Sequence, residues 1–535
     1  MKILIVGAGV SGLVALKELR DVGFDCVCVE ADDGIGGVFR LREVGGAYDS
    51  TRLTVSNYFM AYSSFPLPAD EPRVFWDCDR YVEYLERFVD HFGLRPHIRL
   101  STRAEDIRLE GDGVAATLVG PDGSSAVYFD AVVVATGTHQ VPKLPELPGS
   151  ETFPGQIVHA VEYRNAAPFA GKRVVCIGIG ETGADVAHEI SQRAASAVLS
   201  IRHYPSIIER WPRGDEHTSD AYTFRVKYLL DRPSLQDHTI RSRLGRKRRA
   251  RTARDRMVND WGIRSGGLYG QWFTKSDVFF DDLADGRLQL NVGGIERIEG
   301  STVVFRDGAR FEADAIVCST GYASAISMGD LAIDDVRDMY KHMIHPDLGT
   351  RITFIGWARP DLGGVPTCSE LQVRYLAQLL TGRRTLPADN ELRRLIEADR
   401  EAEERYFNNA SGLKTAVPYT RFCDGLARLI GCHPLGGAKV YPPDVLLKLL
   451  FGSLIGAHYR LVGPDADPAS ALPVIRRLPI VIGRREALEA AARLGVSRLP
   501  FIGERAMRRA SKRAQALFTE YLEANGGTGT APGAP

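Results

Sequence analysis

The chain has no excess of charge, no pair of cysteines at redox spacing and no long apolar run. Its 67 Lys and Arg residues balance 67 Asp and Glu residues, which gives no reason to expect nucleic acid or an anionic membrane as a partner. None of the 8 cysteines forms a Cys-x-x-Cys pair, so enzymes that pass electrons through an adjacent dithiol are excluded. Val445–Leu454, interrupted by Lys448, is far shorter than the about 20 residues that span a bilayer. The chain starts directly with a strand-like run, and we therefore expect a reduced, cytoplasmic protein without a secretion leader.

Two glycine-rich turns stand 171 residues apart, and each follows a short apolar run and precedes a stretch with helical spacing. Each segment reads as strand, turn, helix and second strand, and this is the only internal repeat that we find. We therefore predict an α/β protein with two doubly wound dinucleotide-binding (Rossmann-like) units, in a chain long enough for about three domains. The turns read Gly7-Ala8-Gly9-Val10-Ser11-Gly12 and Gly178-Ile179-Gly180-Glu181-Thr182-Gly183.

The residue at the end of the second strand predicts a different cofactor for each unit. In such turns the glycines let the backbone approach a pyrophosphate, which the amino end of the following helix also attracts. Glu30 closes the second strand of the first unit, and a carboxylate there accepts both ribose hydroxyl protons but repels a 2′-phosphate. FAD or NAD is therefore expected in the first unit. The second unit has Arg202 at this place, followed by Arg210, and a guanidinium favours NADPH.

Three further segments are expected to approach a cofactor or to cross between the units. Gly36-Gly37 before Val38-Phe39 would let the backbone run close under a flat ring system. Thr136-Gly137 and Thr320-Gly321 follow strand-like runs and mark the two crossings, which predicts that the second unit is inserted into the first. The predicted domains are a first part of the FAD domain (1–165), an NADPH domain (166–315) with a helical insertion (about 205–280), a second part of the FAD domain (316–470), a C-terminal helical extension (471–525) and a disordered tail (526–535).

The string FPGQIVHAVEY matches a known fingerprint, Phe-x-Gly-x-x-x-His-x-x-x-Tyr, through Phe153, Gly155, His159 and Tyr163. With the two turns, this makes the chain resemble the flavin-containing monooxygenases, class B flavoprotein monooxygenases that use FAD and NADPH. Baeyer–Villiger enzymes usually end the fingerprint in Trp-Pro, whereas this chain has Tyr163-Arg164, so oxygenation of a heteroatom is favoured. The resemblance covers roughly residues 1–470 and includes Tyr62-Ser-Ser-Phe65-Pro66, Cys318-Ser-Thr320-Gly321-Tyr322, Leu371-Gln372-Val-Arg374 and Tyr459-Arg-Leu-Val-Gly463-Pro464.

The resemblance implies that NADPH reduces the flavin, that a flavin 4a-hydroperoxide forms with dioxygen, and that a soft nucleophile, N or S of a small molecule, takes the oxygen. The N,N-dimethylaniline monooxygenases are the model for this reaction. Thr54 stands where drug-oxidising members have Asn, and Asn57 lies three residues away; these two are the candidate catalytic residues. Baeyer–Villiger-type oxygenation and an uncoupled NADPH oxidase remain open. The predicted cofactor-binding residues are Gly7, Gly9, Ser11, Gly12, Glu30, Gly37, Val38, Phe39, Thr54, Val55, Thr136, Gly137, Gly178, Gly180, Thr182, Gly183, Arg202, Thr320, Gly321 and Gln372.

Other conspicuous residues receive structural interpretations. His159 is expected to be a structural hydrogen-bonding residue, and the helix beginning near Thr367 is expected to aim its positive end at the reduced flavin. Nine basic residues in Arg241–Arg256 are interpreted as a solvated helix face. His342 and His345 have no partners at ligand spacing, so no metal is expected. The expected partners are a small-molecule substrate and dioxygen, without nucleic acid or membrane; a homodimer is left open, and the sequence does not name the substrate.

Overall fold

The computed structural model describes most of the chain but not all of it. No helix in the described part is long and apolar enough to cross a membrane. The predicted tail (526–535), most of the predicted C-terminal extension and the basic run up to residue 251 lie outside the described residues. The described residues are 1–42, 45–68, 70–211, 217–226, 252–265, 273–323, 326–328, 331–408, 410, 413–436 and 441–481, with 512, 513, 516 and 520.

The first sheet has five parallel strands in the order β20-β7-β1-β2-β3. Ile3 and Ile5 of β1 belong to the core shared with α1 (Val10–Asp21) and α9 (Val365–Leu380), whereas Leu4 and Val6 belong to the core on the opposite face. Burial on both faces explains why these strands are continuous apolar runs. The strands are β1 (Lys2–Val6), β2 (Asp25–Val29), β3 (Ile98–Arg99), β7 (Ala131–Val134) and β20 (Ile352–Phe354).

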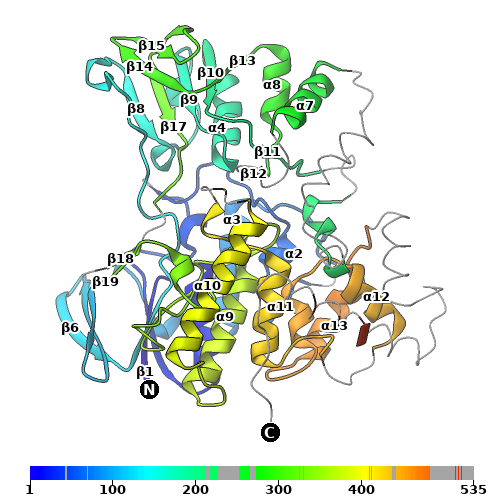
Figure 1. The fold of residues 1–535 in the computed structure, drawn as a ribbon. Helices are drawn as coiled ribbons and strands as arrows, with labels where there is room; N and C mark the ends of the chain where they lie inside the picture. Colours follow the sequence, from blue (N-terminus) through cyan, green and yellow to red (C-terminus); the bar gives the residue numbers. More distant parts are fainter. Residues whose placement is uncertain are drawn as a thin grey trace.

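The second sheet repeats this arrangement, with five parallel strands in the order β13-β10-β9-β17-β8 (Figure 1). Val174 and Cys176 of β9 pack in the core with the helices α4 (Glu181–Ser191) and α8 (Phe279–Asp285), and α7 (Ala253–Arg264) lies against α8. The strands are β8 (Gln156–His159), β9 (Arg173–Ile177), β10 (Ser196–Ile201), β13 (Leu288–Val292) and β17 (Ala315–Cys318).

Each parallel sheet carries a three-stranded antiparallel sheet on the face away from its helices. Val114, Leu118 and Phe129 cover the first sheet, and Val303 and Phe305 cover the second. The repeated unit therefore contains a three-stranded antiparallel sheet as well as the parallel sheet, which the sequence did not predict. Antiparallel strands with one exposed face carry no glycine motif. The sheets consist of β4 (Arg103–Glu110), β5 (Gly113–Gly120) and β6 (Gly123–Phe129), and of β14 (Ile295–Glu299), β15 (Thr302–Phe305) and β16 (Arg310–Glu312).

The second sheet lies between β7 and β20 in the sequence, so the predicted insertion of one unit into the other is confirmed. The boundaries at 165/166 and 315/316 need correction, because β8 pairs with β17 inside the second sheet and β17 pairs with β9. Parallel strands buried on both faces read alike, so their sequence does not say which sheet they join. The chain leaves the first sheet after β7 and returns to it at β20.

Further helices and short strands complete the two units (Figure 1). Two short parallel pairs are formed by β11 with β12 and by β21 with β22. Leu449 of α12 and Leu426 of α11 join the large core of the first unit. These elements are α2 (Asn57–Met60), α3 (Cys78–His91), α10 (Asp389–Tyr406), α11 (Tyr419–Ile430), α12 (Pro443–Phe451), α13 (Pro468–Arg477), β11 (Ser206–Ile207), β12 (Phe273–Thr274), β18 (Ile326–Met328), β19 (Leu331–Ile333), β21 (Arg359–Pro360) and β22 (Ala416–Val417).

Candidate functional site

The first glycine turn leaves no space for side chains. Gly7 has a φ of 105°, and a Cβ there would stand 2.7 Å from the carbonyl oxygen of Ala135, the residue after β7. A Cβ on Gly12 would overlap the carbonyl of Gly7. Gly9 begins α1 without a side-chain cap, so the first N–H groups of this helix are free to bind a phosphate. The turn therefore fits the predicted FAD pyrophosphate.

Glu30 is held beside this turn by the backbone. Its Oε2 accepts a hydrogen bond from the N–H of Ala8 at 2.7 Å, and its Oε1 accepts one from Asp32 at 3.0 Å. Each carboxylate oxygen has a second lone-pair site, which can accept a ribose hydroxyl. The position thus has the geometry that the sequence predicts for a nucleotide without a 2′-phosphate.

The loop after β2 runs directly against the first turn. Gly36 and Gly37 have φ values of 118° and 58°, and a Cβ on Gly37 would stand 3.1 Å from the Cα of Gly9. Val38 is 41% exposed, so its side chain is available for contact. Phe39 instead packs edge to face on Tyr81, at 4.8 Å between ring centroids, which gives it a packing role in the structure.

The second glycine turn has the same shape as the first. Gly178 has a φ of 95°, and a Cβ there would meet the carbonyl oxygen of Ser319 at 2.5 Å. A Cβ on Gly183 would overlap the carbonyl of Gly178. Gly180 begins α4 without a side-chain cap, so this helix also offers free N–H groups. Arg202 follows β10 and is exposed, where a 2′-phosphate can reach it.

The two segments that cross between the units are hydrogen-bonded to each other. Gly137 and Gly321 both have a φ of 78°, which favours glycine at each bend. Lys143 N donates to the carbonyl of Gly321 at 2.9 Å, and the Thr320 hydroxyl donates to the carbonyl of Lys143. The outgoing and returning segments therefore lie side by side, as the two motifs predict.

The fingerprint residues hold this joint together. His159 Nδ1 accepts a hydrogen bond from Val161 N at 3.1 Å, so the ring proton is on Nε2 and is donated to the carbonyl of Gly321 at 3.0 Å. Burial lowers the pKa of His159 and favours this neutral form. His159 thus has the hydrogen-bonding arrangement of a structural residue.

The other fingerprint residues also have packing and hydrogen-bonding roles. Gly155 fits against the carbonyl of Asp314 and the ring of Phe153, where a Cβ would overlap. The Tyr163 hydroxyl donates to Glu189 of α4 at 2.6 Å. The fingerprint therefore joins β8, the crossing and α4.

Thr54 and Asn57 have different environments in the structure. Asn57 is fully buried; its Nδ2 donates to Pro72 O at 2.9 Å, and its Oδ1 accepts from Tyr58 N and Val74 N, both at 3.1 Å. These bonds give Asn57 a structural role at the start of α2. Thr54 is half-buried and makes no side-chain hydrogen bond to any described residue, so its hydroxyl is available to a ligand.

Gln372 lies in α9 and is fully buried behind the first turn. Its Oε1 accepts from Gly356 N at 3.4 Å, and its Nε2 donates to the carbonyl of Lys341 at 2.9 Å. Gly364 begins α9 without a side-chain cap, and Ser11 and Ser369 hydroxyls are 2.9 Å apart. The amino end of α9 therefore lies close to the first glycine turn.

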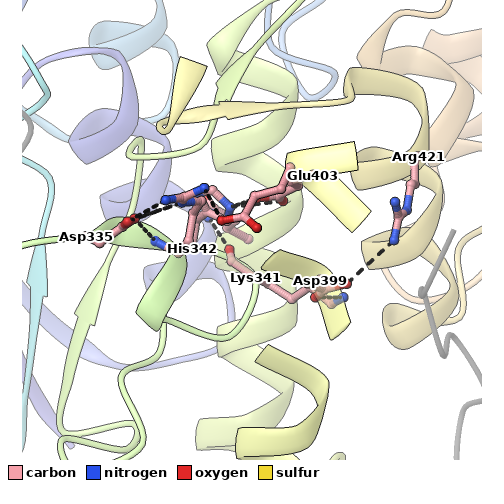
Figure 2. A network of polar contacts seen from close by, with 9 residues as sticks. Asp335, Lys341, His342, Asp399, Glu403 and Arg421 are labelled. Carbon is pink, nitrogen blue, oxygen red and sulfur yellow. Dashed lines mark hydrogen bonds and ion pairs between the residues drawn. The ribbon is translucent and has the colours of Figure 1, made fainter. Parts of the chain in front are cut away.

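A polar network holds the turn that Gln372 contacts (Figure 2). Lys341 and His342 both have a φ of 52°, which non-glycine residues adopt at a cost of about 1–2 kcal/mol each. Lys341 Nζ binds Asp399 at 2.6 Å, and His342 Nε2 lies 3.0 Å from both oxygens of Glu403, two acids on α10. Asp399 is also 3.9 Å from Arg421. These contacts hold the turn against α10, and His342 has a structural partner far away in the sequence.

The sequence analysis missed a group of buried charges near Thr54. Asp220 accepts hydrogen bonds from Ser56 N and from the Thr218 hydroxyl, and lies 3.5 Å from Arg73. Lys275, directly after β12, is only 7% exposed. No motif marks these residues, because their contacts join segments more than a hundred residues apart.

Comparisons with known proteins agree with this geometry. A family model described as flavin-binding monooxygenase-like matches residues 1–475. Two curated proteins named 4-hydroxybenzoate brominase (decarboxylating) are similar: one from Marinomonas mediterranea is 37% identical, covering 89% of this chain and 93% of that protein, and one from Pseudoalteromonas luteoviolacea is 35% identical, covering 94% and 99%. Among solved structures, S-allyl-L-cysteine S-oxygenase from Allium sativum shares the fold, with a TM-score of 0.57 and 22% identity over 80% of this chain and 87% of that one.

Proposed function

This chain belongs to the flavin-binding monooxygenase-like family, and we propose that it oxygenates bromide in order to brominate a 4-hydroxybenzoate-like aromatic acid with loss of its carboxyl group. Its cofactors are FAD and NADPH, and it acts on small molecules with dioxygen. The observation that carries the proposal is the 37% identity that extends over 93% of a 4-hydroxybenzoate brominase. Bromide is a soft nucleophile, as are the nitrogen and sulfur that the sequence analysis favours.

The proposed reaction balances without a further reductant. NADPH, dioxygen, bromide, the aromatic carboxylate and protons are consumed, and NADP, water, carbon dioxide and the aryl bromide are formed. FAD, when bound, takes hydride from NADPH and activates dioxygen, which is chemistry that protein side chains do not supply. The chain must therefore position both nucleotides, admit bromide and keep water away from the reacting atoms.

We assign the binding of FAD to the first unit and of NADPH to the second. The free N–H groups at the start of α1 and α4 would hold the two pyrophosphates, and Glu30 would hold the ribose of FAD. The amino end of α9 would stabilise negative charge on the reduced flavin ring. The Thr54 hydroxyl, which has no partner among the described residues, would be free to hydrogen-bond a cofactor or the substrate.

Oxygenation of nitrogen or sulfur is the second candidate function. The fingerprint ends in Tyr163-Arg164 rather than in the Trp-Pro that is usual for Baeyer–Villiger enzymes, which supports a heteroatom as the acceptor. Bromide oxygenation and heteroatom oxygenation require the same cofactor geometry. The choice between them therefore depends on the pocket and on the substrate offered.

The deciding experiment supplies the holoenzyme with NADPH, oxygen and 4-hydroxybenzoate, with and without bromide. The expected result is a brominated phenol, recognised by the paired isotope peaks of bromine in mass spectra, and carbon dioxide release only when bromide is present. Oxygenated dimethylaniline or thioether without any bromination would favour the second candidate. Hydrogen peroxide equal to the NADPH consumed, with every substrate and with bromide, would identify an uncoupled oxidase and contradict both.

Arg202 is expected to set the preference for NADPH over NADH. A guanidinium about 4 Å from a phosphate contributes at most about 4 kcal/mol at an effective dielectric constant of 20, and solvent screening reduces this at an exposed position. Arg202→Ala should therefore lower the ratio of kcat/KM for NADPH to that for NADH by about tenfold or more, mainly through the KM for NADPH. Steady-state kinetics with both nucleotides measures this, and an unchanged ratio would show that Arg202 does not discriminate.

A further inference from the structure

Lys275 is a buried ammonium group without a counterion in contact. It follows β12, is 7% exposed, and its Nζ makes no hydrogen bond or ion pair with any described residue. Its Nζ lies over the ring of Phe273, 5.6 Å from the centroid. Desolvation by burial lowers the pKa of Lys275. A charge held in this way is costly unless a ligand supplies its partner.

Two of the three acids around Lys275, Asp361 and Asp220, are hydrogen-bonded to other donors. Asp361 accepts from Leu362 N at 2.7 Å, from Tyr419 N at 3.0 Å and from the Tyr406 hydroxyl at 3.1 Å. Asp220 is engaged by Ser56 N and Thr218. Both acids, like Glu181, act on Lys275 through the electrostatic field and without a direct contact.

Hydrogen bonds on either side of Lys275 place it beside the second glycine turn, because Thr274 Oγ1 donates to Ile179 O and Ser276 Oγ donates to Asp185 of α4. The acids whose charges act on Lys275 belong to segments of both units. Glu181 is the first residue of α4, directly after the second glycine turn. Asp361 precedes the amino end of α9, and Asp220 holds the backbone of Ser56, two residues after Thr54. An anion bound by Lys275 would therefore lie beside the segments expected to carry the flavin, the nicotinamide and the reacting atoms.

A second cation near Thr54 is also incompletely paired. Arg73 lies over the ring of Tyr58 at 4.9 Å, donates to the Ser453 hydroxyl at 3.0 Å and lies 3.5 Å from Asp220. Its Nη2 is buried and has no hydrogen-bond partner. Donors for the phosphates of the two nucleotides are also present at α1, α4 and Arg202.

We propose that Lys275 is the substrate-binding residue that pairs with the carboxylate of the aromatic acid, with Arg73, the other cation beside Asp220, as a second donor. This assignment rests on the proposed function, in which the substrate is an aromatic carboxylate. It explains why a lysine is kept inside the protein at a cost in stability, since the ion pair forms only when the substrate binds. The acid is thereby selected over neutral phenols.

The test compares Lys275→Met with the wild-type holoenzyme. A charged hydrogen bond contributes about 1.5–3 kcal/mol, so the Kd and KM for 4-hydroxybenzoate should rise about tenfold to a hundredfold. The neutral amide 4-hydroxybenzamide should bind both proteins equally, and flavin content and the KM for NADPH should stay unchanged. Lys2→Met, at the amino end of β1 and far from the site, is the control that should change none of these values.

Binding is also followed without turnover, by titrating the oxidised flavin spectrum with 4-hydroxybenzoate, so that this assignment is judged even if no bromination occurs. An unchanged Kd in Lys275→Met would overturn it, and so would a selective rise in the KM for NADPH, which would assign the ammonium to the coenzyme. Thermal unfolding gives an independent readout: without substrate, Lys275→Met should melt at the same or a higher temperature than the wild type, because an unpaired buried charge is removed. A lower melting temperature would show that Lys275 supports the fold and would contradict the assignment.

Discussion

Replacing Gly12 with alanine is expected to yield a purified protein without its yellow flavin. The new Cβ would overlap the carbonyl of Gly7, and neither backbone segment can move without opening the turn that faces the pyrophosphate. Overpacking of this kind costs about 1–3 kcal/mol. Here it would displace the free N–H groups at the start of α1, which are expected to bind the pyrophosphate. We expect the flavin content per chain, measured from the absorption spectrum, to fall about tenfold or more.

Gly183→Ala is the matched substitution in the second unit and should have the opposite phenotype. Its Cβ would overlap the carbonyl of Gly178 and stand 3.2 Å from the Cβ of Ser319. The protein should stay yellow but should be reduced poorly by NADPH, with a KM raised about tenfold or more. The same pair of variants tests the assignment of FAD to the first unit and NADPH to the second; exchanged phenotypes would reverse that assignment.

A glycine with open space around it provides the control for both variants. Gly262 lies in α7, and a Cβ there would meet nothing within 4 Å. Gly262→Ala should bind both cofactors normally and should be as stable as the wild type or more stable by up to about 1 kcal/mol. If Gly262→Ala lost flavin as Gly12→Ala does, the loss would reflect general instability and not the geometry of the turn.

Asp424→Asn is expected to destabilise the protein by about 3–5 kcal/mol. Asp424 of α11 and Arg225 are both fully buried, and Arg225 binds it through Nε at 2.9 Å and Nη2 at 3.0 Å. Arg225 Nη1 also donates to Leu449 O, and the Tyr459 hydroxyl donates to Asp424 at 2.7 Å. The substitution leaves a guanidinium inside the protein without its counterion, and denaturant unfolding should show a lower midpoint.

Two comparisons make this result specific to the buried pair. Arg225→Met with Asp424→Leu removes both charges and should recover most of the lost stability, because apolar side chains of similar volume replace the pair. Glu391→Gln breaks the exposed pair with Arg394 and should have no measurable effect. An Asp424→Asn protein as stable as the wild type would mean that the segment around Arg225 is not anchored to α11 in solution.

Much of the nucleotide-binding framework could be predicted from single residues. The glycines at 7, 12, 178 and 183 stand where a Cβ would collide with backbone, so local steric rules alone identify them. Glu30 and Arg202 follow strand ends that the apolar pattern marks. His159 is predicted to be a structural hydrogen-bonding residue, and its partner Gly321 belongs to another recognisable motif.

The prediction was less complete where the hydrogen-bond partner of a residue lies far away in the sequence and belongs to no motif. Asn57 is a candidate catalytic residue in the sequence, but its side-chain amide is hydrogen-bonded to the backbone of Pro72 and Val74. His342 was weighed only as a possible metal ligand, and no metal was expected there. Its partner Glu403 lies on a helix that no sequence pattern places next to His342. The domain boundaries were misplaced because β8 and β17 could join either sheet.

The sequence by itself determined the two glycine turns, the order of strands and helices around them, the insertion of one unit into the other, and the family. These features depend on backbone sterics and on periods of a few residues, which neighbouring residues specify. Only the tertiary structure decided which charges are paired inside the protein. Arg225 pairs with Asp424 and His342 contacts Glu403, whereas Lys275 contacts no counterion among the residues that the structure describes. Burial and pairing depend on segments that meet only after the chain has folded.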